Sequence, residues 1–236
     1  KEKNMGEFVE CVYGIKEACE FLDFPVVSGN VSFYNETNTK SIFPTPVIGG
    51  IGVLNNLKKI MNIKTKRPGN LIMVIGKTFG HLNQSAFLQE NFSICDGPPP
   101  EINLINEKNN GLAILKLIKE NFILSAHDIS SGGILLSLTE MSMASKLGLK
   151  IYKPKKLINP LEYFFGEDQG RYLVEIEKNN LNKINNFLKK NNIFGEVVAE
   201  VQNDTFEIEK TFSFNIQEFC NYNNQWYYKY NAIGKK

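Results

Sequence analysis

Apolar side chains recur at helical spacing near the start of the chain. Alternating steps of four and three residues relate Phe8, Val12, Ile15, Cys19 and Leu22. This spacing predicts an amphipathic helix whose apolar stripe faces a core. The helix should end before Pro25, because proline disfavours helical geometry in the residue that precedes it.

The second half of the chain alternates strand and helix patterns. Apolar runs predict strands at residues 71–76, 122–126, 172–176, 193–201 and 205–214. Helical spacing predicts four helices: one through Leu112, Leu115 and Ile118, one with the stripe Ile134, Leu138, Met141 and Ser145, one over 180–191 and one over 216–230. We expect the last helix to bury Phe219 and Trp226. This order of elements predicts an α/β (α+β) fold.

The most distinctive polar stretch follows the first helix. Residues 25–27 predict a short buried strand, and the chain then presents Ser28, Gly29, Asn30 and Ser32. A glycine lets a ligand approach the backbone, an amide oxygen suits a hard cation, and a hydroxyl donates or accepts a hydrogen bond. A tight bend explains the same composition, and composition alone favours the bend. A second extended stretch is expected over residues 43–54.

Two later turns are also candidate sites. Residues 128–133 join a strand to a helix, where free N–H groups attract anions; Ser130 or Ser131 capping the helix is the ordinary alternative. Glu167, Asp168 and Gln169 could hold a phosphate or a metal, or form a surface turn. His127 has no paired Ser or Cys nucleophile in the sequence and is weak evidence for catalysis, and His81 is interpreted as a loop or surface histidine rather than a ligand.

Composition narrows the classes of protein. The 236 residues are 42% hydrophobic, enough for a packed core, and the net charge of +2 gives no footprint for nucleic acid or for an anionic membrane. The four cysteines lack metal-ligand spacing, no apolar run is long enough for a membrane span and no signal peptide is visible, so we expect a cytoplasmic protein with free thiols. Because the first residue is Lys1, we also expect a fragment.

Three groups of motifs resemble phosphoribosylformylglycinamidine synthase, the synthetase subunit of purine biosynthesis. The first group comprises residues 25–36 (PVVSGNVSFYNE) and 43–49 (FPTPVIG). The second comprises residues 96–100 (DGPPP) with 126–133 (AHDISSGG), and the third is 165–171 (FGEDQGR). They stand in the order of that family and span most of the chain. Residues 80–85 depart from the glycine-rich segment usual there.

The resemblance implies an aminoimidazole ribonucleotide synthetase-like fold. In that family an N-type domain contributes strands to a shared barrel, and a C-type α/β domain lies beside it. Residues 1–69 then correspond to the end of the second N-type domain, and residues 70–236 to the complete second C-type domain.

The resemblance also implies chemistry. Family members use ATP and Mg²⁺ to convert formylglycinamide ribonucleotide to formylglycinamidine ribonucleotide, with ammonia from a glutaminase subunit and a small bridging subunit in the complex. By position, Gly29 resembles the ATP-contacting glycine, Asn30 the magnesium ligand and Ser32 the substrate contact; no residue is expected to be catalytic. The isolated chain should be inactive. A non-catalytic assembly module, or another ATP-dependent member of the fold group, remains the alternative.

Overall fold

A computed structural model describes residues 2–32, 34, 36–38, 40–154 and 158–233. The chain divides into two compact units, residues 1–55 and 56–236. Among the described residues, no helix is long and apolar enough to cross a membrane.

The first unit contains one long helix and little other regular structure. Helix α1 (Glu2–Leu22) ends before Pro25 as predicted, and β1 (Glu36–Thr37) pairs with β2 (Lys40–Ser41) in an antiparallel hairpin. The predicted stripe of α1 is only half buried, since Val12 is 49% and Leu22 is 38% exposed. The expectation that this stripe lies in a core is therefore wrong for the unit as it stands.

The strand predicted at residues 25–27 is also wrong. The segment has no regular structure, and Val26 and Val27 are 67% and 82% exposed. Residues 43–54 likewise form no strand, with Phe43 84% and Val47 91% exposed. A strand needs a neighbouring strand for its backbone hydrogen bonds and a layer to cover its apolar face. The described part of this unit supplies neither for these two segments.

The second unit is built on a seven-stranded sheet with the order β4-β6-β3-β7-β5-β8-β9. In chain order the strands are β3 (Leu71–Ile75), β4 (Ser125–Asp128), β5 (Leu149–Ile151), β6 (Tyr172–Ile176), β7 (Gly195–Val201), β8 (Thr205–Ile208) and β9 (Phe212–Asn215). Neighbours are antiparallel except for β5 and β8. The single strand predicted over 205–214 is in fact the hairpin of β8 and β9. The mixed helix and sheet class is confirmed.

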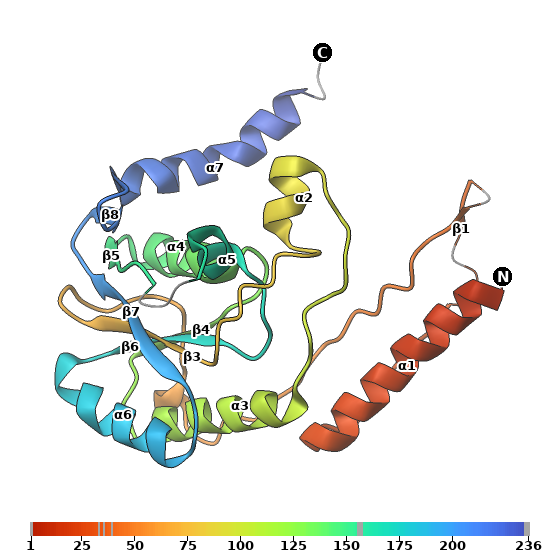
Figure 1. Ribbon diagram of the computed structural model, residues 1–236, viewed down its shortest axis with the longest axis horizontal. Helices are drawn as coiled ribbons and strands as arrows, with labels where there is room; N and C mark the ends of the chain where they lie inside the picture. Colours follow the sequence, from red (N-terminus) through yellow and green to blue (C-terminus); the bar gives the residue numbers. More distant parts are fainter. Residues whose placement is uncertain (1, 33, 35, 39, 155–157, 234–236) are drawn as a thin grey trace. The chain divides into compact units, whose positions relative to one another are not determined.

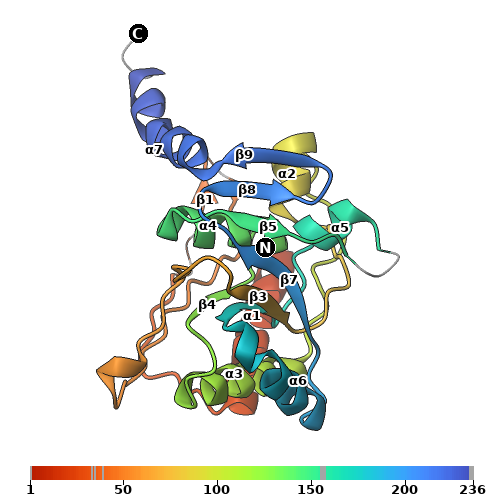
Figure 2. The ribbon, with the colours of Figure 1, turned by 90° about the vertical axis from the view of Figure 1, so that its left-hand side faces the viewer.

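Helices cover both faces of this sheet (Figures 1 and 2), with α3 and α6 on one face and α4 and α5 on the other. The helical elements are η1 (Leu57–Lys59), α2 (Ala86–Phe92), α3 (Leu104–Lys119), α4 (Gly133–Ser145), α5 (Pro160–Phe165), η2 (Lys178–Asn180), α6 (Leu181–Lys190) and α7 (Ile216–Ile233).

Strand β3 lies between two hydrophobic cores. Its residues Leu71, Met73 and Ile75 pack with α3 and α6, whereas Ile72 and Val74 pack on the side of α4 and α5. Successive side chains of a strand point to opposite faces, so a strand covered on both faces must be apolar throughout. The predicted buried strand at 71–76 is confirmed on this basis.

The predicted helices exist, but not all of their predicted faces are buried. The stripe of α4 is confirmed, since Ile134, Leu138 and Met141 are fully buried. In α3 the buried apolar residues are Ala113, Ile114 and Leu117, while Leu112 and Leu115 are exposed. Apolar residues occupy nearly every position of α3 from 112 to 118, so spacing could not select the inner face.

Helix α7 forms as predicted, but the expectation that it buries Phe219 and Trp226 is wrong. These side chains are 37% and 56% exposed, whereas Ile216 and Cys220 are the buried residues of the helix. The helix packs on α4 and β9. The aromatic residues therefore lie outside the core.

Candidate functional site

The residues expected to bind ATP, metal and substrate lie together in the first unit. Gly29, Asn30 and Ser32 are all exposed and belong to an irregular segment that follows α1. Two further residues of the same motif, Phe33 and Asn35, lie outside the described residues. The roles assigned to Gly29, Asn30 and Ser32 stay predictions.

The groups that ATP and Mg²⁺ would require are only partly present here. A Cβ added at Gly29 would meet nothing within 4 Å, so this backbone is open to a ligand. Asn30 offers one amide oxygen, whereas Mg²⁺ in proteins usually takes one or two carboxylates together with phosphate oxygens and water. Over the described residues, no group of three or more His, Cys, Asp and Glu side chains could hold a metal ion. The described residues therefore do not complete a magnesium site.

The second candidate site is confirmed as a turn between a strand and a helix. Strand β4 ends at Asp128, and α4 begins at Gly133. The prediction that Ser130 or Ser131 caps the helix is wrong. The N-cap residue is Gly132, with φ 80°, which has no side chain to cap the helix. This left-handed conformation favours glycine.

A carboxylate from another turn occupies the start of α4. Glu167 Oε1 accepts a hydrogen bond of 2.7 Å from the N–H of Gly132 and one of 2.8 Å from the N–H of Ala86, the first residue of α2. The N–H groups at a helix start carry a partial positive charge that favours an anion. Glu167 supplies that anion from within the protein.

Asp168 is an internal ligand of a second kind. Its Oδ2 accepts hydrogen bonds of 2.9 Å from the N–H groups of Phe79 and Gly80, and its Oδ1 accepts one of 3.2 Å from His81. The side chain is 6% exposed. Neighbouring N–H groups that converge in this way form an anion-binding nest. The residue fixes the loop between β3 and α2.

Arg171 completes this turn. Its guanidinium donates to the carbonyl oxygens of Asp168 and Gly166 and to the hydroxyl of Thr78, and Nη1 lies 3.7 Å from Asp168 Oδ2. Burial lowers the pKa of Arg171, and the Asp168 carboxylate opposes this shift. The sequence left two alternatives open for Glu167 and Asp168: binding an external ligand or forming a surface turn. Neither alternative included the hydrogen bonds that these carboxylates accept from backbone N–H groups of the protein itself.

The two turns line a pocket of about 300 Å³, and three of its ten lining residues carry carboxylates. Glu107, Asp128 and Glu167 contribute carboxylates, and each of the three guanidinium nitrogens of Arg171 donates a hydrogen bond to another group of the protein. Burial raises the pKa of Glu107, and burial together with the charges of Glu107 and Asp128 raises that of Tyr172. Such walls disfavour a phosphate.

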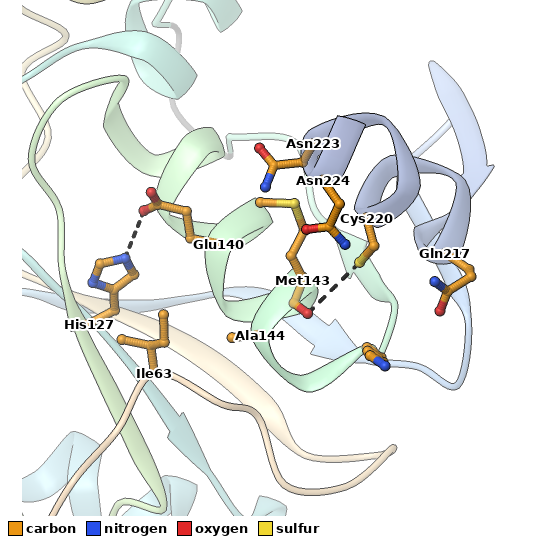
Figure 3. Close-up of a pocket in the computed structure, with 10 residues that line it drawn as sticks. Ile63, His127, Glu140, Met143, Ala144, Gln217, Cys220, Asn223 and Asn224 are labelled. Atoms are coloured by element: carbon orange, nitrogen blue, oxygen red, sulfur yellow. Dashed lines mark hydrogen bonds and ion pairs between the residues drawn. The ribbon is translucent and has the colours of Figure 1, made fainter. Parts of the chain in front are cut away.

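A larger hollow of about 430 Å³ lies between α4 and α7 (Figure 3). His127 stands at one side, with Nε2 2.9 Å from a carboxylate oxygen of Glu140 and Nδ1 3.3 Å from one of Asp128. On the other side, Cys220 faces the carbonyl oxygen of Met143. These contacts hold β4, α4 and α7 together and include no pairing of His127 with a nucleophile. Among the described contacts, His127 joins β4 to α4 through Glu140.

The sequence of residues 67–210 matches the AIR synthase related protein, C-terminal domain. The matched segment contains the β3-to-β8 part of the sheet, with both turns just described. The chain belongs to this family.

Membership of the AIR synthase related family agrees with the similarity to curated relatives. The chain is 47% identical over 229 residues, 97% of its length, to the phosphoribosylformylglycinamidine synthase subunit PurL of Pelagibacter ubique. The alignment covers 31% of that relative, so the chain spans about a third of its length. The resemblance read from the motifs is confirmed.

Solved structures show the AIR synthase-like fold. Thermotoga maritima PurL complexed with ATP aligns with 70% of this chain and 28% of that one, at a TM-score of 0.56 and 20% identity. The same protein complexed with FGAR aligns with 70% and 30%, at a TM-score of 0.58 and 21% identity. The expected fold class is confirmed.

Sequence reasoning missed one further buried carboxylate. Glu175, in the middle of β6, is fully buried and accepts hydrogen bonds from Lys66 N, Asn70 Nδ2 and Ser125 Oγ. It holds the backbone of Lys66 and Arg67 against the sheet, and residues 56–69 belong to the second unit by their contacts. A glutamate within a strand whose neighbours are all apolar was the available signal.

Proposed function

We propose that this chain is part of a phosphoribosylformylglycinamidine synthase synthetase subunit, an ATP-dependent ligase that converts formylglycinamide ribonucleotide and glutamine-derived ammonia to formylglycinamidine ribonucleotide. The observation that carries the proposal is 47% identity to the P. ubique PurL subunit over 97% of the chain. The reaction belongs to the whole synthetase, of which this chain supplies about a third.

The domain assignment is part of the proposal. Residues 1–69 would form the end of an N-type, barrel-contributing domain, and residues 70–236 a C-type α/β domain. Two observations support this division: the family match begins at residue 67, and exposed apolar residues crowd the segment 43–54. A segment that becomes a strand only when neighbouring barrel strands pair with it exposes such residues in their absence.

The site assignment also belongs to the proposal. Gly29 would let the phosphates of ATP approach the backbone, Asn30 would give an amide oxygen to Mg²⁺, and Ser32 would hydrogen-bond the substrate. Their exposure and the open space at Gly29 support this assignment. Magnesium would neutralise charge on the transferred phosphoryl group when bound. The remaining ligands would come from the rest of the synthetase.

A chimeric synthetase tests the proposal. The segment of P. ubique PurL that aligns with this chain is replaced by the chain, and release of ADP is measured with ATP, Mg²⁺, formylglycinamide ribonucleotide and ammonium. We expect a kcat/KM within about tenfold of the parent, about 1.4 kcal/mol in transition-state free energy. A folded chimera without substrate-dependent ADP release would contradict the proposal.

The isolated chain is expected to be inactive in the same assay, because the proposed site lacks carboxylate ligands. Turnover at a rate comparable to that of the intact synthetase would contradict this. The proposal also places the protein in the cytoplasm, in a complex with a glutaminase subunit and a small bridging subunit. All four cysteines are free thiols, which suits a reducing compartment.

A non-catalytic assembly role for the second unit is the alternative. The observation that favours it is the engagement of Glu167 and Asp168 by backbone N–H groups of the protein itself. Isothermal titration of the 236-residue chain with ATP and Mg²⁺ separates the two roles. A non-catalytic assembly role predicts no ATP binding by the chain, whereas the proposed site predicts Mg²⁺-dependent ATP binding that Asn30→Ala weakens.

A further inference from the structure

Helix α7 exposes six aromatic side chains. Its exposed aromatic residues are Phe219 (37%), Tyr222 (69%), Trp226 (56%), Tyr227 (58%), Tyr228 (75%) and Tyr230 (69%). Figure 2 shows the C-terminal half of α7 projecting past the rest of the second unit. Contiguous apolar patches of this kind mark interaction sites, and Tyr and Trp are enriched in them.

Four of these residues form one stripe along the helix, here called the aromatic stripe: Phe219, Tyr222, Trp226 and Tyr230. Their spacings of three, four and four residues confine them to an arc of about 80° at about 100° per residue. The buried residues Ile216 and Cys220 lie on a different face. The stripe continues onto the sheet edge, because Phe219 stacks on Phe214 of β9 at 5.4 Å between ring centroids.

Two charged residues of α7 lie beside the aromatic stripe. Glu218 and Lys229 are the only charged residues in the sequence of this helix. At about 100° and 1.5 Å per residue, they lie within about 20° of each other around the axis and about 16 Å apart along it. They therefore flank the same side of the aromatic stripe, and Lys229 Nζ lies 5.3 Å from the ring centroid of Tyr222.

We propose that the aromatic stripe pairs with the aromatic stripe of a second copy of this chain, with the two α7 helices antiparallel. A two-fold axis perpendicular to the helices keeps the charged flank of each copy on the same side. When the axis passes between residues 223 and 224, Glu218 of each copy lies opposite Lys229 of the other. A two-fold interface must be self-complementary in this way.

The alternative orientation of the same helices is unfavourable. A parallel pair is related by a two-fold axis along the helices, which puts the charged flanks of the two copies on opposite sides of the interface, so that Glu218 and Lys229 gain no partner in the other copy. The sign and position of these two charges thus select the antiparallel pair. This proposal does not depend on the proposed activity.

A charge-reversal cycle tests the pair. The mass and dimer dissociation constant of the 236-residue chain are measured by sedimentation velocity at several concentrations and salt levels. Glu218→Lys and Lys229→Glu each place like charges opposite one another twice per dimer, and each is expected to raise the dissociation constant roughly tenfold. The double variant Glu218→Lys/Lys229→Glu restores opposite charges and is expected to recover the parent value.

Two matched variants complete the experiment. Trp226→Ala removes the centre of the stripe and should give a monomer. At a protein concentration where the parent is also monomeric, its thermal unfolding midpoint should equal that of the parent, since this side chain is 56% exposed. Lys189→Glu reverses an exposed charge on α6 and should leave the dimer unchanged. A parent chain that is monomeric at every concentration overturns the proposal. So does a dimer that the single reversals leave intact, or one that the double variant does not restore.

Discussion

Two polar segments of this chain look alike in sequence and differ in structure. The turn 166–171 and the segment 28–32 both place glycine beside polar side chains after an apolar run. In the turn, backbone N–H groups surround the carboxylates of Glu167 and Asp168. In the segment 28–32 every residue is exposed. A polar motif thus becomes an internal ligand where the fold supplies converging donors, as at Glu167 and Asp168, whereas the segment 28–32 lies at the surface of the first unit.

The largest expected effect comes from neutralising the internal ligand. Asp168→Asn should lower the free energy of unfolding by about 2–4 kcal/mol, because an amide cannot accept from all three N–H groups and leaves the buried Arg171 without its counter-charge. Chemical denaturation of parent and variant measures the difference. Asp128→Asn, 67% exposed at the side chain, is the control and should stay within about 0.5 kcal/mol. Equal effects at the two positions would remove the distinction between the segments.

Substitutions of Glu167 remove its hydrogen bonds in two steps and so test the same contrast between internal ligand and exposed residue. Glu167→Ala leaves the N–H groups of Gly132 and Ala86 without their acceptor and should cost about 1–3 kcal/mol. Glu167→Gln keeps one acceptor oxygen and should recover about half of that loss, the remainder being the charge effect at the helix start. Gln169→Ala, at an exposed neighbour in the same turn, should change stability by less than about 0.5 kcal/mol. A neutral result for Glu167→Ala would contradict the bridging role.

Glu107 tests the acidic pocket beside the turn. Burial raises its pKa above 4.5, so the folded state binds a proton more readily than the unfolded state does. Its stabilising contribution is therefore complete below pH 4.5 and is lost as the pH rises through the folded-state pKa. Glu107→Gln should be more stable than the parent at neutral pH by a few tenths of a kcal/mol, with no gain in acid. The unfolding free energies of parent and variant, measured from acid to neutral pH, test this expectation. A variant less stable than the parent at neutral pH would contradict it.

Much of the second unit could be predicted from sequence because its elements pack within the described chain. Strand β3 and the stripe of α4 follow directly from apolar spacing, and both are buried as expected. The strand at 25–27 failed for a different reason: apolar composition indicates burial but not which surface provides it. The α7 aromatics failed in the same way, since their spacing predicts a buried face and the described fold does not cover it.

The candidate sites show the same difference between local patterns, which the sequence predicts, and long-range contacts, which it does not. Sequence correctly located the turn at 128–133, because an apolar strand followed by glycines and a helical stripe is a local pattern. It could not show that Glu167, distant in sequence, accepts from the N-cap of α4. Nor did it identify Glu175 as an acceptor for Lys66 and Asn70. Hydrogen bonds between segments far apart in the chain leave no local spacing to read.

The smallest expected effect on stability belongs to Asn30, and it completes the comparison. Its side chain is exposed, so Asn30→Ala should change the free energy of unfolding of the chain by less than about 0.5 kcal/mol. Gly29→Ala is the matched control, because a Cβ there enters open space. In the chimeric synthetase, by contrast, Asn30→Ala should raise the Mg²⁺ concentration needed for half-maximal activity, since one metal ligand is lost. A variant that unfolds the chain and leaves the magnesium dependence unchanged would make Asn30 a structural residue of the same kind as Asp168. The segment 28–32 would then no longer be a candidate site, and the contrast with the turn would disappear.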